Sequence, residues 1–428
     1  KSQIILVSPQ TQIVQGAITV QGTGYRNNET VQIDFGTHYT ITTTKVLGNG
    51  TFSVTFLVST QPYDPPIYKT ITATGLGSKE VAIDTTTFTI KPNIFCIDPT
   101  QGSPGKIVTV WGTGYEETEN IHILFGTDTD AQFNASTNIN GTFSTTFTVT
   151  AQENGTTVIT AQGVDSGVKA TTTFIIIAGI SEILPGRGPV GTVVTLAGGG
   201  YADNLAVQID FGTHQTITTI ITKENGTFSG TFIVSTQIQG TTVVTVMNID
   251  GSGAKATALF EILSQIILIT PKIDFVNEVI TVEGTGYGIS GELIQIDFGT
   301  HETITTTIID NQNGTFSATF IISSQPYCTK AITVTGELSD QHEGSLASDH
   351  NLYHTAVFYL DARITIFTPT SGNVGTLVSI EGTGFGTVGT LIQIDFGTHI
   401  SITTTQTSLH GTFSLTFIIS TQEAGNTV

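Results

Sequence analysis

Charged residues and long apolar runs are scarce in this sequence, and each shortage argues against a class of protein. Lys and Arg number 14 against 34 Asp and Glu, which gives a formal net charge of -20 at pH 7. Because these few basic residues cannot form the positive surface that phosphate contacts require, we expect no nucleic-acid partner. Apolar runs such as residues 174–177 are far shorter than the roughly 20 residues of a membrane-spanning helix, so no membrane span is expected in this segment.

Cysteines and the residue sets of common catalytic sites are also scarce. The sequence has no nucleophile elbow, no metalloprotease motif and no carboxylate pair in a cleft-forming context. Glycine clusters at 284–288 and 382–386 lack the following helix that a phosphate cradle needs, so we interpret them as turns. We therefore expect no enzymatic activity and no cofactor. Cys96 and Cys328 lie far apart in the chain and are expected to be free thiols, with an intermolecular bridge as the alternative.

A composite motif occurs five times and divides the chain. Its first copy reads Gly22-Thr23-Gly24-Tyr25, then Ile33-Asp34-Phe35-Gly36-Thr37-His38, then Asn49-Gly50-Thr51-Phe52. The second glycine recurs at 24, 114, 200, 286 and 384, and a preceding proline at 9, 99, 185, 271 and 369, so both markers are separated by 90, 86, 86 and 98 residues. Identical spacing of unrelated residue types indicates tandem units. We assign the units to residues 1–90, 91–179, 180–265, 266–363 (with an insert at 339–354) and 364–428.

Each unit is predicted to contain about seven short strands and no helix. In the first unit Val31, Ile33 and Phe35 alternate with polar residues, and so do Phe52, Val54, Phe56 and Val58. A period of two places such residues on one face of a strand. We expect a hairpin at Asn49-Gly50, because this dipeptide is a strong hairpin signal. The predicted fold class is all-β: a tandem array of immunoglobulin-like β-sandwiches that forms an elongated rod.

One long segment resembles a known family. Residues 369–385 read Pro-Thr-Ser-Gly-Asn-Val-Gly-Thr-Leu-Val-Ser-Ile-Glu-Gly-Thr-Gly-Phe, a pattern similar to the IPT/TIG immunoglobulin-like domains. The resemblance extends over every unit. It implies the sandwich fold and the cell-surface or extracellular setting of many such repeats, but it specifies no activity. The fourth unit departs from the pattern at residues 272–277, where a glycine-rich loop is expected.

The joints and the two ends of the chain give further expectations. The joints contain only a few residues, as at Lys91-Pro92-Asn93, so successive units are expected to stack as a semi-rigid rod. No signal peptide is visible at Lys1, which suggests a processed or partial chain. The fifth unit lacks its last two strands relative to the first. Either the natural chain continues beyond Val428, or another subunit donates strands to it.

Seven sequons of the Asn-x-Ser/Thr type are candidate N-glycosylation sites. In four of them the Asn-Gly turn explains the asparagine without a sugar, and in the other three it does not. The first group is Asn49, Asn140, Asn225 and Asn313, and the second is Asn28, Asn134 and Asn154.

Recurring carboxylates and imidazoles are the remaining candidates for a binding site. Asp34 and His38 recur as Asp210 and His214, Asp297 and His301, and Asp395 and His399. Such a pair could share a metal or contact another subunit, but a solvated Asp and a His that begins the next strand are the simpler interpretation. The insert contains Asp340, His342, Glu343, Asp349, His350 and His354, of which the last two have ligand spacing. We interpret it as a solvated loop and assign no metal site.

Uniform units, short joints and Thr-rich strands favour a structural, extracellular protein. We expect a glycosylated building block of a cell-surface filament, stalk or surface layer that associates with copies of itself. The alternative is an adhesin or receptor ectodomain that binds carbohydrate or protein through its loops.

Overall fold

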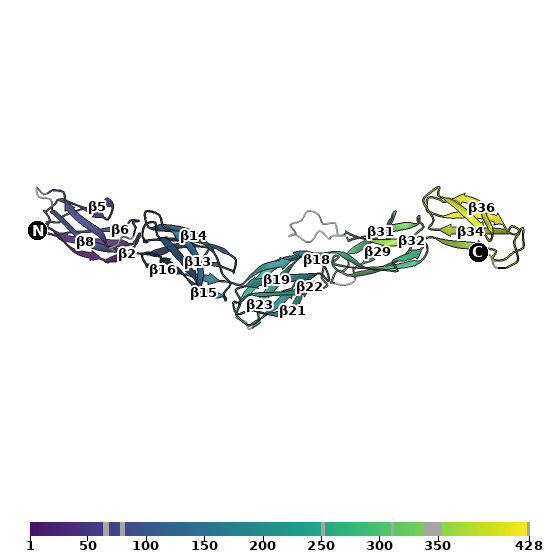
Figure 1. The fold of residues 1–428 in the computed structure, drawn as a ribbon, viewed down its shortest axis with the longest axis horizontal. Helices are drawn as coiled ribbons and strands as arrows, with labels where there is room; N and C mark the ends of the chain where they lie inside the picture. Colours follow the sequence, from purple (N-terminus) through teal and green to yellow (C-terminus); the bar gives the residue numbers. More distant parts are fainter. Residues whose placement is uncertain (63–67, 78–81, 250–252, 310–311, 337–352, 426–428) are drawn as a thin grey trace.

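The computed structural model describes residues 1–62, 68–77, 82–249, 253–309, 312–336 and 353–425. The chain is all-β and forms five sandwiches, which follow one another end to end in a long row (Figure 1). Each of the first four sandwiches has one three-stranded and one five-stranded sheet. Frequent Thr, Val and Ile residues suit these strands, because β-branched side chains pack well on a pleated surface.

The first sandwich shows the arrangement that the others repeat. Its three-stranded sheet has the order β1 (Gln3–Ser8), β3 (Ala17–Thr23) and β6 (Phe52–Leu57). Its five-stranded sheet has the order β2 (Thr11–Ile13), β8 (Ala82–Lys91), β7 (Lys69–Gly75), β4 (Thr30–Phe35) and β5 (His38–Lys45). All neighbours are antiparallel except β2 and β8, which are parallel. This is an immunoglobulin-like topology.

The corresponding strands of the other sandwiches follow in the same order. The second has β9 (Asn93–Asp98), β10 (Gln101–Gly102), β11 (Ile107–Thr113), β12 (Asn120–Phe125), β13 (Asp128–Ser136), β14 (Thr142–Thr148), β15 (Gly155–Gly163) and β16 (Lys169–Ile176). The third has β17 (Gly179–Leu184), β18 (Arg187–Pro189), β19 (Val193–Gly199), β20 (Ala206–Phe211), β21 (His214–Ile221), β22 (Phe228–Ile233), β23 (Gly240–Asn248) and β24 (Lys255–Leu263).

The fourth has β25 (Gln265–Thr270), β26 (Ile273–Phe275), β27 (Val279–Thr285), β28 (Leu293–Phe298), β29 (His301–Ile308), β30 (Phe316–Ile321), β31 (Cys328–Gly336) and β32 (Tyr353–Asp361). The fifth has β33 (Arg363–Thr368), β34 (Leu377–Thr383), β35 (Leu391–Phe396), β36 (His399–Gln406) and β37 (Phe413–Ile418). As far as residue 425, its second sheet consists of β35 and β36.

Two sequence-based expectations need correction. Each of the first four sandwiches has eight strands rather than seven, because the first strand is divided at a proline that cannot donate to the ladder. The two parts, β1 and β2 in the first sandwich, belong to opposite sheets. The expected hairpin at Asn49-Gly50 is also wrong, because β5 pairs with β4 whereas β6 pairs with β3. The actual two-residue hairpin is at Gly36-Thr37, where Gly36 has a φ of +60°.

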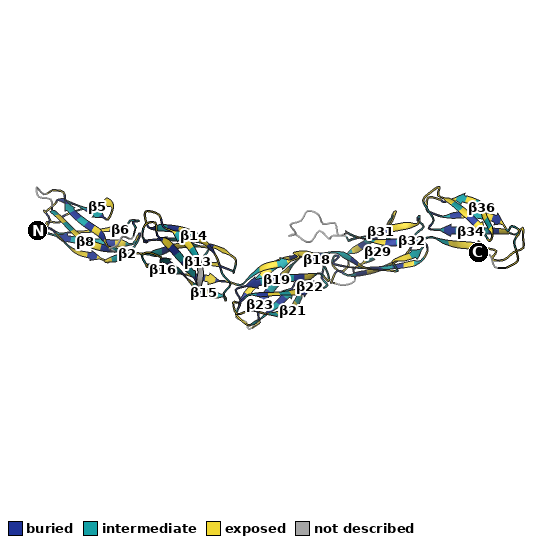
Figure 2. Cartoon of the chain, viewed as in Figure 1, coloured by how far each residue is buried: buried dark blue, intermediate teal, exposed yellow. Residues whose placement is uncertain are grey.

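Each sandwich encloses its own apolar core, and buried residues, dark blue in Figure 2, alternate with exposed ones along the strands. The predicted alternation is confirmed in the first sandwich, where Val31, Ile33 and Phe35 are fully buried. Phe35 packs edge-on against Phe88 of β8, two strands away in the same sheet, with ring centroids 5.5 Å apart. Burial of one such side chain contributes about 2 kcal/mol, so each core fixes the register of its own strands.

Candidate functional site, the joint between sandwiches

The recurring motif residues gather at the two ends of each sandwich, which we call its N-pole and C-pole. The N-pole carries the turn after the second long strand, with Gly24 and Tyr25, and the turn at Asn49-Gly50. The C-pole carries the Gly36-Thr37 hairpin and the segment after β6, which contains Gln61. The C-pole of each sandwich faces the N-pole of the next.

At the N-pole, two distant parts of the motif form one unit. The amide of Tyr25 donates to the carbonyl of Gly50 at 3.2 Å, and the Tyr25 ring packs edge-on against Phe52 with centroids 5.1 Å apart. The Phe52 ring lies over Gly22, where a Cβ would approach it to 2.3 Å, so only glycine fits there. The same amide-to-carbonyl bond recurs as Tyr115–Gly141, Tyr201–Gly226, Tyr287–Gly314 and Phe385–Gly411.

The tyrosine hydroxyls of the N-poles are buried. The Tyr25 hydroxyl donates to the carbonyl of Ala73, and Tyr115 and Tyr201 make equivalent bonds to Ala161 and Val246. Burial raises the pKa of Tyr25 to about 12, with a smaller contribution from the negative charge of Asp84. Burial likewise raises the phenol pKa of Tyr115, Tyr201 and Tyr287 above the ordinary range. These rings are therefore neutral anchors of the N-pole at physiological pH.

The second glycine of the motif receives the incoming linker. Gly200 has a φ of +77°, and a Cβ there would lie 2.4 Å from the carbonyl oxygen of Ile177 in the preceding linker. Equivalent close approaches involve Gly114 and Lys91, Gly286 and Leu263, and Gly384 and Asp361. Because β24 ends at Leu263 and β25 begins at Gln265, the linker there is a single residue. The glycine thus permits the linker backbone to lie directly on the N-pole.

At the C-pole, a buried glutamine holds the segment that contacts the next sandwich. Gln61 is 1% exposed; its Nε2 donates to the carbonyl of Phe35 at 3.0 Å and to Ser59 Oγ at 2.8 Å, and its Oε1 accepts from the Thr37 amide at 2.9 Å. These bonds tie the segment after β6 to the Gly36-Thr37 hairpin. Equivalent glutamines are Gln152, Gln237, Gln325 and Gln422.

The residue after the glutamine lies against the Asn-Gly turn of the next sandwich. A Cβ on Gly141 would lie 2.9 Å from the Cα of Pro62, and one on Gly314 would lie 3.1 Å from the Cα of Ile238. The other two joints bring together Glu153 and Gly226, and Pro326 and Gly411. All four joints therefore repeat one backbone-to-backbone contact. The sequence patterns above did not predict this role, although a Ser/Thr-x-Gln triplet recurs at 59–61, 150–152, 235–237, 323–325 and 420–422.

Individual joints add polar contacts to this common arrangement. Between the second and third sandwiches, the Asp203 amide donates to Glu153 Oε1 at 2.9 Å. Between the fourth and fifth, Arg363 forms an ion pair with Glu278 at 2.6 Å and donates to the carbonyl of Val276 at 3.0 Å. Its guanidinium also lies 5.3 Å from the centre of the Phe275 ring. These contacts restrict rotation at the joint beyond what the short linker alone does.

The recurring Asp and His residues have separate structural roles. Asp34 Oδ1 accepts from the Thr40 amide and from Gln32 Nε2, each at 2.7 Å, and so supports a bulge in which Thr40 has a φ of +53°. Asp210, Asp297 and Asp395 make the equivalent bonds. The bond from the Ser401 amide, followed by that from Gln393, lowers the pKa of Asp395 below its usual value.

The histidines contact serine or threonine hydroxyls instead. Nδ1 of His38 lies 3.3 Å from Ser59 Oγ, and His214 and His301 contact Ser235 and Ser323 in the same way. Nδ1 of His399 lies 3.5 Å from Thr398 Oγ1. Each Asp and each His thus has its own partners within the sandwich. Among the described residues, no cluster of three or more His, Cys, Asp or Glu side chains is placed to hold a metal.

Most of the insert lies outside the described residues, including Asp340, His342, Glu343, Asp349 and His350. His354 lies on β32, where its Nδ1 is 3.3 Å from the Ile266 amide, and burial lowers its pKa. Cys96 and Cys328 are both exposed free thiols, as expected. Within the described ranges, no helix has the length and apolar character needed to cross a membrane.

The seven sequon asparagines lie at four kinds of place. Asn49, Asn140, Asn225 and Asn313 are exposed in the N-pole turns beside the joints. Asn28 is exposed with a φ of +63°, so a left-handed turn gives this asparagine a structural reason that the sequence did not reveal. Asn134 is exposed on β13, and Asn154 is half-buried after Glu153 at the joint between the second and third sandwiches.

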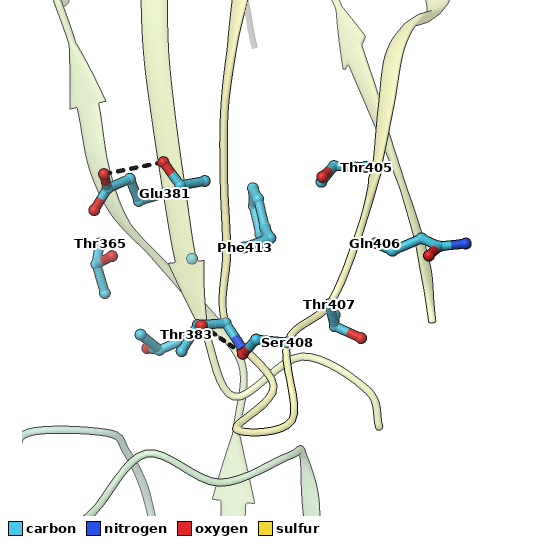
Figure 3. A pocket seen from close by; sticks show the side chains of 11 residues that line it. Thr365, Glu381, Thr383, Thr405, Gln406, Thr407, Ser408 and Phe413 are labelled. Carbon is cyan, nitrogen blue, oxygen red and sulfur yellow. Dashed lines mark hydrogen bonds between the residues drawn. The ribbon is translucent and has the colours of Figure 1, made fainter. Parts of the chain in front are cut away.

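Two hollows on the described part of the row are of interest for binding. One of about 420 Å³ lies in the fifth sandwich, where Figure 3 shows Thr365, Glu381, Thr383, Gln406 and Phe413 around it. Hydroxyl groups dominate its lining, and Glu381 is the one ionisable residue in it. The other, of about 380 Å³, lies at the joint between the third and fourth sandwiches and is lined by Thr213, Gln237, Ile238, Ile289, Ser290 and Gln312. In the first hollow Ser414 Oγ donates to Glu381 Oε1 at 3.1 Å, and neither lining contains a His, Lys or Cys side chain.

Comparison with known proteins yields structural similarity only. The sequence matches no protein-family model, and no curated protein matches it. A tetra-tandem repeat from the extending region of a large adhesion protein is 13% identical, with 82% of this chain and 98% of that chain covered and a TM-score of 0.21. Invasin, a bacterial integrin-binding protein, is 14% identical, with 87% and 81% covered and a TM-score of 0.22. A Salmonella alpha-2-macroglobulin is 8% identical, with 99% and 38% covered and a TM-score of 0.18.

Proposed function

We propose that this chain is a structural, extracellular protein whose sandwiches form a semi-rigid rod within a cell-surface filament, stalk or surface layer. The supporting observation is the joint, because four joints repeat the contact between the residue after the C-pole glutamine and the next Asn-Gly turn. Flexibly linked modules need no such contact. We further propose that the units are of the IPT/TIG type and divide at the boundaries assigned from the repeat.

The stiffness of the rod is tested by small-angle X-ray scattering of the whole chain. A strand of ten residues such as β8 spans about 33 Å, so each sandwich is about 35–40 Å long with its turns and five in a row extend about 175–200 Å. We expect a maximum dimension in this range and the distance distribution of a rod. A broad ensemble of much shorter dimensions would show that the joints bend freely and would refute the rod.

Assembly and glycosylation are tested on material from the natural source. Electron microscopy is expected to show ordered fibres or lattices, whereas isolated rods would favour a role in adhesion. N-glycans on several of the seven sequons would add mass, and we expect the exposed Asn134 to be among the modified residues. An intact mass equal to that of the bare polypeptide would refute glycosylation without affecting the rod.

The hollow between the third and fourth sandwiches supports a second candidate function, that of an adhesin. Its lining mixes the hydroxyls and amides of Thr213, Ser290 and Gln312 with the apolar surfaces of Ile238 and Ile289, a combination that suits a sugar ring. A glycan array tests this function. If a sugar binds, replacement of Gln312 by Ala is expected to weaken it, and absence of all binding leaves the structural role.

A further inference from the structure

The strand that follows the Gly-Thr hairpin lies at the edge of its sheet in every sandwich, and four of these edges are nearly identical in sequence. β5 stands last in the order of its sheet, and so do β21, β29 and β36 in theirs. We call these four the edge strands. Their central residues read Thr-Ile-Thr-Thr-Thr at 40–44, Thr-Ile-Thr-Thr-Ile at 216–220, Thr-Ile-Thr-Thr-Thr at 303–307 and Ser-Ile-Thr-Thr-Thr at 401–405. Each edge strand shares hydrogen bonds with one neighbour and presents its other side outward.

The edge strands lack the usual protection against pairing. Exposed edges of soluble proteins commonly carry Lys, Pro or inward-pointing charges. β21 and β36 contain no Asp, Glu, Lys or Arg, whereas β29 contains only Glu302 and β5 contains only Lys45, at its last position. Each edge strand does have a bulge, but it lies at Thr40 or its equivalents, before the run of Ile and Thr. The Asp34 carboxylate satisfies the Thr40 amide within the sandwich, and the residues that follow continue in regular register with β4.

The second sandwich is an exception. Its corresponding strand, β13, contains Asp128 and Asp130 and carries the sequon asparagine Asn134 at an exposed position. The carbonyl of Asn134 accepts a bond from Thr145 Oγ1 of β14 at 3.3 Å, so part of this edge is already satisfied within the sandwich. β13 therefore differs in sequence from the other four strands, which contain at most one charged residue each.

We propose that the edge strands pair with the edge strands of a second copy of this chain, antiparallel and side by side. A second copy is the occupant that the sequences favour, because each of the four edges presents almost the same side chains and therefore fits any of the others in one register. Each row carries four such edges, so one row can pair with more than one neighbouring copy. The inference rests on the proposed structural role and specifies how its rods associate laterally.

Charge gives this association a salt dependence. Two copies, each of formal net charge -20, repel one another at low ionic strength, whereas the edge strands themselves are almost neutral. Added salt screens the repulsion and leaves the backbone hydrogen bonds intact. Association is therefore expected to strengthen as salt rises, the opposite of an interface held by ion pairs.

The test compares two matched triple variants of the whole chain. The edge variant carries Thr43→Lys, Thr219→Lys and Thr404→Lys, which place charge at exposed positions of the edge strands. The central-strand variant carries Thr70→Lys, Thr156→Lys and Thr241→Lys. These make the same change in charge at exposed positions of β7, β15 and β23, which are flanked by strands on both sides. Sedimentation velocity at increasing protein and salt concentration measures self-association under reducing conditions, so that Cys96 and Cys328 form no disulfide. Circular dichroism checks that both variants fold.

We expect the parent chain and the central-strand variant to associate alike, and the edge variant to associate at least 10-fold more weakly. Equal weakening of both variants would assign the effect to net charge and overturn the proposal. A parent chain that stays monomeric at high salt would also overturn it. X-ray scattering of the monomers separates this result from a failure of the proposed function, because the rod dimension persists in the edge variant if only lateral pairing is lost.

Discussion

Substitution of Gly200 by Ala tests whether the close approach of linker and N-pole stabilises the rod. Gly200 has a φ of +77°, and a left-handed conformation costs a residue with a Cβ roughly 1–2 kcal/mol. The new Cβ would also lie 2.4 Å from the Ile177 carbonyl oxygen and 3.2 Å from the Cα of Ala178. Backbone cannot rotate away as a flexible side chain does, so the linker must move by about 1 Å, and such overpacking costs about 1–3 kcal/mol. The sum is about 2–5 kcal/mol.

Gly191→Ala is the matched control. Gly191 has a φ of +89° in the same sandwich, but nothing lies within 4 Å of the position that its Cβ would take. The control thus includes the conformational cost of about 1–2 kcal/mol and omits the collision with the linker. The two variants should differ by about 1–3 kcal/mol, which is the contribution of the linker contact alone.

Hydrogen exchange with peptide resolution is the appropriate assay, because five sandwiches do not unfold as one two-state unit. The free energy of opening is measured from the amides of β19 and β22, the middle strand and one outer strand of the three-stranded sheet in the third sandwich. Protection there should fall roughly 5- to 150-fold more in Gly200→Ala than in Gly191→Ala. Equal loss of protection in both variants would show that the linker moves freely and would refute the idea of a fixed joint.

Three further predictions follow from the poles. Gln237→Ala removes bonds from the Phe211 carbonyl and Thr213 amide, so it should destabilise the third sandwich by about 1–3 kcal/mol and increase proteolysis after β22. The raised pKa of Tyr201 means that the stability contributed by the neutral phenol is complete below pH 10 and is lost at higher pH as the folded pKa is approached. Tyr201→Phe should therefore reduce alkaline unfolding of the third sandwich, measured by hydrogen exchange. The fifth sandwich has Phe385 at this position and should lack the sensitivity. The lowered pKa of Asp395 means that its carboxylate supports the bulge above pH 3.8 and that this support is lost as pH falls below that value. The Ser401 amide resonance should therefore shift with acid in the parent chain and not in Asp395→Asn.

The sequence was sufficient to predict the fold class because strand patterns and turns are local. Alternation at Val31, Ile33 and Phe35 placed these residues in a core correctly. The Asn49-Gly50 signal failed because a two-residue turn specifies a reversal of the chain but not which strand pairs with the next. Here the chain reverses while it crosses from one sheet to the other, and the pairing of β6 with β3 depends on contacts more than thirty residues apart.

The joint was the part that the sequence could not reveal. Recurrence alone does not say that Gln61 belongs to one sandwich and that the residue after it contacts the next. That assignment needs the direction of every strand, which places Gly36 and Gln61 at one pole and Gly24 and Gly50 at the other. Likewise, the spacing of Asp34 and His38 suggested a shared ligand, whereas the bulge turns the carboxylate toward Thr40 and leaves the imidazole beside Ser59.

The parallel pairing of β2 with β8 has a mechanical consequence. The same pairing recurs between β10 and β16, β18 and β24, and β26 and β32. The chain enters a sandwich at one pole and leaves it at the other, so tension along the row pulls these two strands past each other lengthwise. Their hydrogen bonds then carry the load together and cannot open one after another. Because rupture under force depends on the rate of unfolding, the row should resist pulling better than its equilibrium stability alone indicates.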